Sequence, residues 1–97
     1  MRPIRDPEGA ELSHLLSVCD LAGSRVLEVG CGDGKFTRQF AHLPSQVVGI
    51  DPVISDLRTA MQEPTISSSR VSFLQTMGEN LPFPRNTFDI AIFACSL

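Results

Sequence analysis

The residues of this sequence best suited to chemistry lie in one short stretch, residues 26–34 (VLEVGCGDG). An apolar segment leads into three alternating glycines, and a helix-like pattern begins directly after them. Glycines suit such a turn because a side chain would block the close approach of a ligand to the backbone. The free amides at the start of a helix favour anionic or polar ligand groups. The stretch therefore predicts a small-molecule site between a strand end and a helix start.

Two carboxylates accompany this turn. Asp51 follows a second apolar segment, about 20 residues on, where a carboxylate can accept both hydroxyls of an adenosine ribose. Glu28 precedes the first glycine, where it would repel a pyrophosphate but suit an amino or sulfonium group. The third glycine also comes two residues after the second, whereas a dinucleotide fingerprint needs three. The pattern favours a cationic, amino-acid-like nucleoside, with a dinucleotide as the alternative.

Each of these acids also has a purely structural alternative. Glu28 could cap the glycine turn by accepting backbone amides. Asp51 could simply end a strand, since Pro52 follows it and Asp-Pro is a common turn.

The elements that position these residues alternate between strand and helix. Apolar segments predict strands at residues 25–29, 46–50, 71–75 and 88–94, and helical periodicity covers residues 35–43 and 55–62. Near-continuously apolar strands alternating with helices predict an α/β fold with a parallel sheet covered on both faces. An earlier amphipathic stripe predicts a first helix, formed by Leu12, Leu15, Leu16 and Cys19. The first nine residues are expected to be irregular.

Composition excludes several other classes of protein. The chain has 97 residues and a formal charge of −3, and its eight basic residues are scattered, which argues against a nucleic-acid binder. The longest apolar run, residues 90–95, is too short to span a bilayer. The first nine residues contain no apolar leader, and three widely spaced cysteines suggest reduced thiols. We therefore expect a cytoplasmic protein without a disulfide framework or a metal site.

Three segments together resemble a class I S-adenosylmethionine-dependent methyltransferase, in the subgroup similar to small-molecule and quinone-precursor methyltransferases. Residues 26–34 match the first family motif, and residues 48–51 (VGID) match the second. Residues 79–84 (ENLPFP) with 86–89 (NTFD) match the linker and fourth-strand signature. The resemblance implies a Rossmann-like sheet whose first four parallel strands have the order 3-2-1-4, with flanking helices. It divides the chain into a lead-in with a helix, residues 1–24, and an S-adenosylmethionine-binding domain, residues 25–97.

The resemblance also implies which residues contact the methionine part of the cofactor, S-adenosyl-L-methionine. Gly30, Gly32 and the turn at Asp33 would lie against it. Glu28 would hold the turn or the cofactor's amino group. Ala94, at the end of the fourth strand, would lie below the methionine moiety.

The adenosine part of the cofactor is implied to contact a second group of residues. Asp51 would bind the ribose hydroxyls, and Pro52 would lie beside the adenine. Met77 and Gly78 would flank the adenine ring. The family usually has an acid at the position of Met77, and losing that acceptor costs on the order of 1 kcal/mol.

No catalytic residue is predicted, because catalysis in this family is mainly positioning and the cofactor carries the chemistry. Cys31 is expected to be packing material, and Asp89 is expected to be a structural residue that opens the fourth strand. The remaining candidates are expected to be core aromatics or surface histidines, namely Phe36, Phe40, His14 and His42.

The predicted function is the cofactor-binding half of a methyltransferase that acts on a small-molecule acceptor, whose identity is not readable. The alternative is a non-catalytic nucleoside-binding or interaction module completed by a partner chain. The last predicted strand ends the sequence and would be an open edge, which favours self-association. Three explanations fit this ending: a fragment of a larger methyltransferase, a domain completed by another chain, or a complete module.

Overall fold

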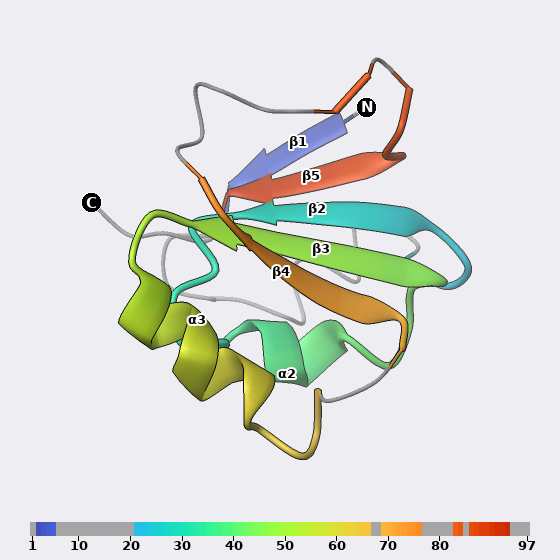
Figure 1. Ribbon diagram of the computed structural model, residues 1–97. Coiled ribbons are helices and arrows are strands. Elements are labelled where there is room, and N and C mark those ends of the chain that lie inside the picture. The colour runs from blue at the N-terminus through green and yellow to red at the C-terminus, as the bar shows by residue number, and fades with distance from the viewer. Residues whose placement is uncertain (1, 6–20, 67–68, 77–82, 85, 94–97) are drawn as a thin grey trace.

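The computed structural model describes residues 2–5, 21–66, 69–76, 83–84 and 86–93. Within these residues the chain forms one parallel sheet with two helices on the same side of it (Figure 1). The elements in chain order are β1 (Arg2–Arg5), β2 (Arg25–Val29), α2 (Thr37–Phe40), β3 (Gln46–Asp51), α3 (Ile54–Met61), β4 (Val71–Gln75) and β5 (Ile90–Phe93). The strand order is β1-β5-β2-β3-β4, and each neighbouring pair is parallel.

The predicted α/β fold and strand order are confirmed. The four strands that the sequence predicts correspond, in chain order, to β2, β3, β4 and β5. Numbered from 1 to 4 in that order, they lie in the sheet as β4-β3-β2-β5, which is the expected order 3-2-1-4. Strands β2 and β4 have the predicted bounds, and β3 extends one residue further, to Asp51. Strand β5 begins at Ile90, two residues later than expected. Parallel strands between other strands are buried on both faces, which explains their continuous apolar character.

The first nine residues were expected to be irregular, and this prediction was wrong for residues 2–5. They form β1, which pairs in parallel with β5 from Arg2 opposite Ile90 to Arg5 opposite Phe93. Four residues that include a proline give little strand signal, and proline is tolerated in strands mainly at a sheet edge. The edge of β5 that was expected to be open is therefore covered (Figure 1). The predicted helix around residues 12–19 lies outside the described residues.

The helices are shorter than, or shifted from, their predicted ranges. Helix α2 has four residues, where periodicity predicted nine, because the glycine turn continues to Phe36 and further turns follow Phe40. Helix α3 begins one residue earlier than expected and buries Leu57 and Ala60. The described helices are too short for a membrane span.

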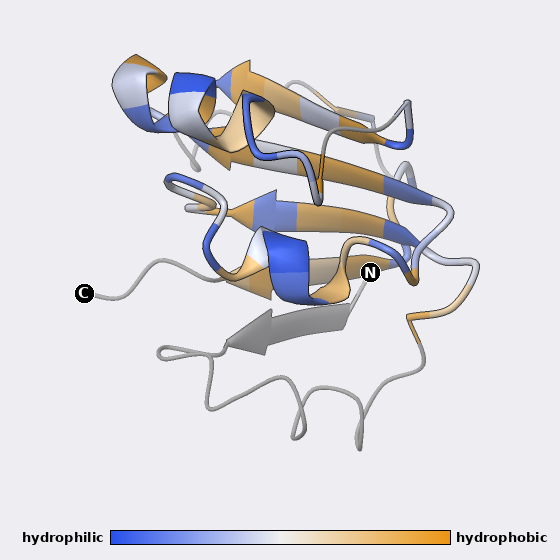
Figure 2. Cartoon of the chain, turned by 90° about the horizontal axis from the view of Figure 1, so that it is seen from below, coloured by the Kyte–Doolittle hydropathy of each residue, from blue (hydrophilic) through white to orange (hydrophobic). Residues whose placement is uncertain are grey.

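The core lies on both faces of the sheet, whose central strands are predominantly apolar (Figure 2). On the α2 face, one cluster contains Leu21, Val26, Phe40, Val47, Ile90 and Ile92, with Phe36 packed against it. The opposite face buries Leu27, Val48, Ile50 and Phe88. The Phe36 and Phe40 rings lie 5.3 Å apart, which confirms them as core aromatics. Layers on both faces hold the ends of β2 and β3 in fixed register, with Val29 opposite Ile50.

Candidate functional site

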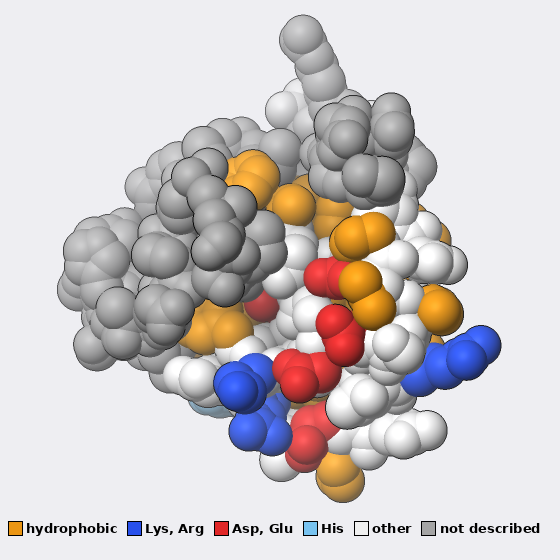
Figure 3. All heavy atoms as spheres, turned by 90° about the vertical axis from the view of Figure 1, so that its left-hand side faces the viewer, with side chains coloured by type: hydrophobic (Ala, Val, Ile, Leu, Met, Phe, Trp, Pro, Cys, Tyr) orange, Lys and Arg blue, Asp and Glu red, His pale blue; other side chains and the backbone are white. Residues whose placement is uncertain are grey.

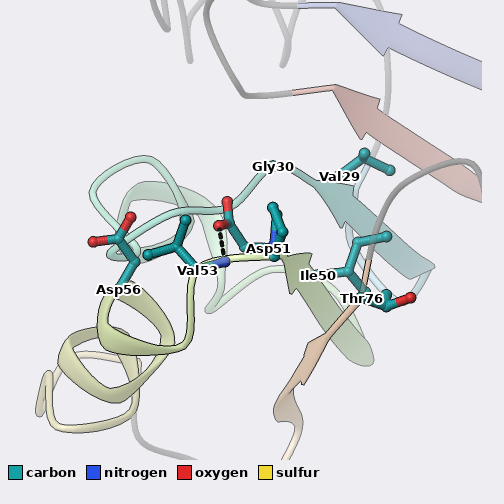
Figure 4. A pocket seen from close by; sticks show the side chains of 8 residues that line it. Val29, Gly30, Ile50, Asp51, Val53, Asp56 and Thr76 are labelled. Atoms are coloured by element: carbon teal, nitrogen blue, oxygen red, sulfur yellow. Dashed lines mark hydrogen bonds between the residues drawn. The ribbon is translucent and has the colours of Figure 1, made fainter.

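A pocket of about 370 Å³ opens at the carboxyl ends of the central strands, beside the start of α3 (Figure 4). Its lining residues are Val29, Gly30, Ile50, Asp51, Pro52, Val53, Asp56 and Thr76. This is the edge at which open parallel α/β sheets bind their ligands. Three of the residues predicted to contact a cofactor line it, namely Gly30, Asp51 and Pro52.

The glycine turn forms one wall of this pocket and is fastened to the end of β3. The amides of Gly30 and Cys31 both donate to the Ile50 carbonyl, at 2.8 and 3.1 Å. Gly30 and Gly32 have φ values of 78° and 57°, in the left-handed region that favours glycine. The turn therefore needs glycine for its backbone conformation.

Asp51 holds the turn from the other side. Its carboxylate accepts from the Gly32 amide through Oδ2 and from the Val53 amide through Oδ1, each at 2.9 Å. The side chain is largely buried, and it joins the glycine turn to the segment that begins α3. The structural alternative for Asp51 is therefore present in the fold. Each carboxylate oxygen has two lone pairs, so Asp51 retains capacity to accept from a ligand.

Glu28 is fully buried and is not among the residues that line the pocket. The Thr37 hydroxyl donates to its Oε1, and its Oε2 is buried without a partner among the described residues. Burial raises the pKa of Glu28 to about 8, although the hydrogen bond from Thr37 opposes the rise. The carboxyl thus contacts the first residue of α2, which was not foreseen from the sequence.

Asp33 is exposed at the tip of the turn, where its Oδ1 accepts from the Lys35 amide at 3.2 Å. It stabilises the turn and does not line the pocket. Three further residues expected at the cofactor lie outside the described residues, namely Met77, Gly78 and Ala94.

Cys31 is buried, as expected of packing material. A β-carbon at Gly49 would lie 2.9 Å from its Sγ, so the sulfur packs directly on the β3 backbone. Burial raises the pKa of the Cys31 thiol well above its usual range, which argues against a nucleophile. His42 is exposed, as predicted, and His14 lies outside the described residues.

Asp89 lies at the opposite end of the sheet from the pocket and is structural, as predicted. Its Oδ2 accepts from the Arg25 amide at 2.8 Å, and its Oδ1 accepts from the Arg25 guanidinium at 3.0 Å. These bonds lower the pKa of Asp89 to about 2. The pair fixes the start of β2 against the segment that leads into β5.

Acidic side chains gather around a hollow at the carboxyl edge of the sheet (Figure 3). Two of the pocket residues contribute to this charge, the largely buried Asp51 and the half-buried Asp56 on the first turn of α3. Asp56 was not foreseen, although its position one helical turn after the Asp51-Pro52 step could have indicated it. Two carboxylates at one pocket favour a ligand with positive charge. Among the described residues, no group of His, Cys, Asp and Glu has the arrangement of a metal site.

Comparisons with known proteins agree with this geometry. A family profile described as "Methyltransferase domain" matches residues 26–97. The ubiquinone biosynthesis O-methyltransferase of Rhodopseudomonas palustris strain BisA53 is 34% identical over 76 residues, which cover 78% of this chain and 30% of that protein. The enzyme of the same name from Rhizobium rhizogenes is 32% identical over 88 residues, covering 91% and 32%. The chain thus spans about a third of the length of these curated relatives.

Solved structures show the same arrangement. A putative methyltransferase from Bacillus halodurans superposes with a TM-score of 0.72 at 29% identity, covering 86% of this chain and 37% of that one. An S-adenosylmethionine-dependent methyltransferase from Mesorhizobium loti gives 0.69 at 28% identity, covering 84% and 37%. The [4+2]-cyclase SpnF gives 0.68 at 33% identity, covering 82% and 31%.

Proposed function

Because the chain belongs to the class I S-adenosylmethionine-dependent methyltransferases, we propose that it forms the cofactor-binding part of a small-molecule methyltransferase. The observation that carries this proposal is the pocket at the carboxyl ends of β2 and β3, with its wall held by the Asp51 carboxylate. When bound, the cofactor supplies an activated methyl group on a sulfonium sulfur. The residues of this chain bind and orient the cofactor.

The described residues fit such a ligand. The pocket volume of about 370 Å³ lies in the range of small-molecule sites. Its apolar wall, which includes Val29, Ile50 and Val53, offers a surface for a flat base, and its two carboxylates suit a cationic nucleoside. The absence of a Cβ at Gly30 leaves the backbone of the turn open to close approach.

We assign each residue to the part of the cofactor that it would contact, from the methionine part to the adenine. The turn at Gly30, Gly32 and Asp33 would lie along the methionine part, and Asp51 would accept from the ribose hydroxyls while keeping its two backbone bonds. Pro52, which lines the pocket and is exposed, would lie beside the adenine. Glu28 would act by holding the turn, since its carboxyl is enclosed. Three contacts remain predictions from the resemblance, namely Met77, Gly78 and Ala94.

The acceptor and the reaction belong to the whole protein. The name of the two curated relatives, ubiquinone biosynthesis O-methyltransferase, supports methyl transfer to an oxygen of a small molecule. A cytoplasmic location is part of the proposal, supported by the free thiol of Cys31.

A second candidate is a nucleoside-binding module that does not transfer a methyl group. A protein named as a [4+2]-cyclase shares this fold at 33% identity. Its name describes a reaction other than methyl transfer, so the fold alone does not establish methyl transfer, and this candidate is retained. Binding and methyl transfer therefore need separate measurements.

Calorimetric titration with S-adenosylhomocysteine, NAD and adenosine tests the site. We expect S-adenosylhomocysteine to bind at least tenfold more tightly than either of the others. Tighter binding of NAD would favour the dinucleotide alternative, and binding of none of the three would contradict the proposed site. Incubation of the full-length protein with methyl-labelled cofactor and small hydroxylated acceptors then separates the two candidates. Labelled product indicates the methyltransferase, and binding without product indicates the module.

A further inference from the structure

Asp56 is a pocket residue whose carboxylate is not used by the fold. It lines the pocket from the first turn of α3 and is half-buried. Its backbone amide donates to the Val53 carbonyl at 3.1 Å. Among the described residues, no group donates a hydrogen bond to its carboxylate, and the ion pairs join other side chains. The carboxylate is therefore available to a ligand.

The charge of Asp56 acts toward the glycine turn. Burial raises the pKa of the Cys31 thiol, and the charges of Glu28, Asp51 and Asp56 raise it further. Because Coulomb interactions weaken with distance and with hydration, Asp56 lies on the side of α3 that faces the strand ends. The helix dipole favours an acid anywhere in the first turn of a helix. It does not explain why this acid lines the pocket.

An apolar side chain separates the two acids of the pocket. Val53 lies between Asp51 and Asp56, both in the chain and in the pocket wall (Figure 4). Its side chain is 46% exposed, so it leaves an apolar surface open to a ligand. This wall of the pocket thus presents a hydrogen-bond acceptor, an apolar surface and a second acceptor, in that order.

Adenosine carries complementary groups in the same order. Its ribose has two hydroxyl donors, its purine ring has an apolar face, and its 6-amino group is a donor at the far edge of the ring. With the ribose at Asp51, as proposed above, the ring would cover Val53 and the amino group would reach Asp56. The methionine part would extend the other way, since Val29 and Asp56 lie on opposite sides of Asp51 (Figure 4).

We propose that Asp56 is a specificity-determining residue of the pocket, whose carboxylate accepts a hydrogen bond from the 6-amino group of the adenine ring. The inference rests on the proposed function, because it takes the pocket as the adenosine site. A carboxylate accepts from an amino group but is repelled by the lone pairs of an oxo group. The pocket should therefore select adenine over hypoxanthine, which has an oxo group at the same ring position.

Calorimetric titration of the unmodified chain with two ligands tests this selection without any substitution. The ligands are S-adenosylhomocysteine and S-inosylhomocysteine, which differ in carrying a 6-amino or a 6-oxo group. We expect S-adenosylhomocysteine to bind at least tenfold more tightly, as a hydrogen bond to a charged group implies. Equal affinity for the two ligands would overturn the proposal.

The Asp56→Asn variant assigns the selection to this side chain. An asparagine amide can accept from an amino group or donate to an oxo group, so the ratio of the two affinities should fall to within threefold. Asp56→Ser, which keeps a polar residue in the first turn of α3, should lower the ratio in the same way. The matched control is Glu63→Gln, which removes one negative charge outside the pocket and should keep the ratio of the unmodified chain. An unchanged ratio in Asp56→Asn and Asp56→Ser would overturn the proposal.

A third ligand, 5′-methylthioadenosine, locates the contact along the cofactor. It keeps the adenine and lacks the amino-acid part, so Asp56→Asn should weaken its binding by the same factor as that of S-adenosylhomocysteine. A loss confined to S-adenosylhomocysteine would place Asp56 at the methionine amino group and overturn the proposal. Failure of the unmodified chain to bind S-adenosylhomocysteine would contradict the proposed function, and this inference with it. Binding that does not depend on Asp56 would overturn this inference alone.

Discussion

The amide of Gly32 donates to Oδ2 of Asp51 at 2.9 Å, across 19 residues of sequence. The same carboxylate accepts from Val53 through its other oxygen, so one side chain joins the glycine turn, the end of β3 and the approach to α3. The wall of the pocket therefore depends on the residue that is proposed to bind the ribose. Loss of Asp51 should weaken a ligand contact and loosen the turn together.

Gly34 and Gly23 provide a matched pair that separates backbone strain from crowding. Both have positive φ, 86° and 74°, but a β-carbon at Gly34 would lie 3.1 Å from Ala60 Cβ on α3 and 2.9 Å from Ile66 Cδ1, whereas Gly23 has open space. We expect Gly23→Ala to cost about 1 kcal/mol from its left-handed backbone. Gly34→Ala should cost a further 1–3 kcal/mol, on the order expected for overpacking. Urea denaturation measures both, and equal losses would contradict the packing of Gly34 against α3.

We expect the Arg25–Asp89 pair to contribute to the free energy of unfolding in a way that depends on pH. Because the pKa of Asp89 is lowered in the fold to about 2 from 3.8, the unfolded chain binds its proton first as the pH falls. The contribution is therefore present above about pH 4 and is lost as the pH falls toward 2. Acid unfolding followed by circular dichroism should show a smaller pH dependence in this window for Asp89→Asn. Parallel curves for the two proteins would contradict the assignment.

Removal of residues 1–5 should expose the edge of β5. In the full chain this edge is paired with β1, from Arg2 opposite Ile90 onward. An apolar strand with an unpaired edge tends to pair with another chain. Light scattering after size-exclusion chromatography should show a larger oligomer for the truncated chain than for the full chain at equal concentration. The same mass for both would show that β1 does not protect the edge.

Most of the sheet could be predicted from sequence because central parallel strands are apolar throughout and are bounded by glycine, proline or polar residues. That is why the central strand β2 has the predicted bounds. Strand β4 lies at the edge of the sheet and is only partly apolar, and its predicted start follows from the polar loop residues before it. Strand β1 escaped prediction because its pairing is with residues almost the whole chain away, and four residues that include Pro3 carry no periodicity. The length of helix α2 was overestimated from the spacing of Phe36, Phe40 and Leu43. That spacing shows that the three side chains are buried on one side, and residues in turns can be buried in the same way.

Within the site, Asp51 and the glycines could be predicted because backbone conformation and strand ends leave a local signal. That Glu28 does not line the pocket could not be predicted. Strand alternation decides which face of the sheet a side chain takes, and the sequence did not say which face would hold the pocket. Thr37 was missed for a related reason: its partner is nine residues away and is reached through the fold. Asp56 is recognisable as a pocket residue only once α3 is placed.

The dissociation constant of S-adenosylhomocysteine for the unmodified chain and for Asp51→Asn tests the central claim most directly. Asparagine keeps one oxygen acceptor and loses the charge and the other, so a loss of about 1–3 kcal/mol, or roughly 5- to 150-fold, is expected. Glu63→Gln is the control, since that carboxylate pairs with Arg38 and does not line the pocket. The account predicts measurable binding that Asp51→Asn weakens at least fivefold and Glu63→Gln leaves within twofold. Equal affinity in Asp51→Asn and the unmodified chain would contradict it.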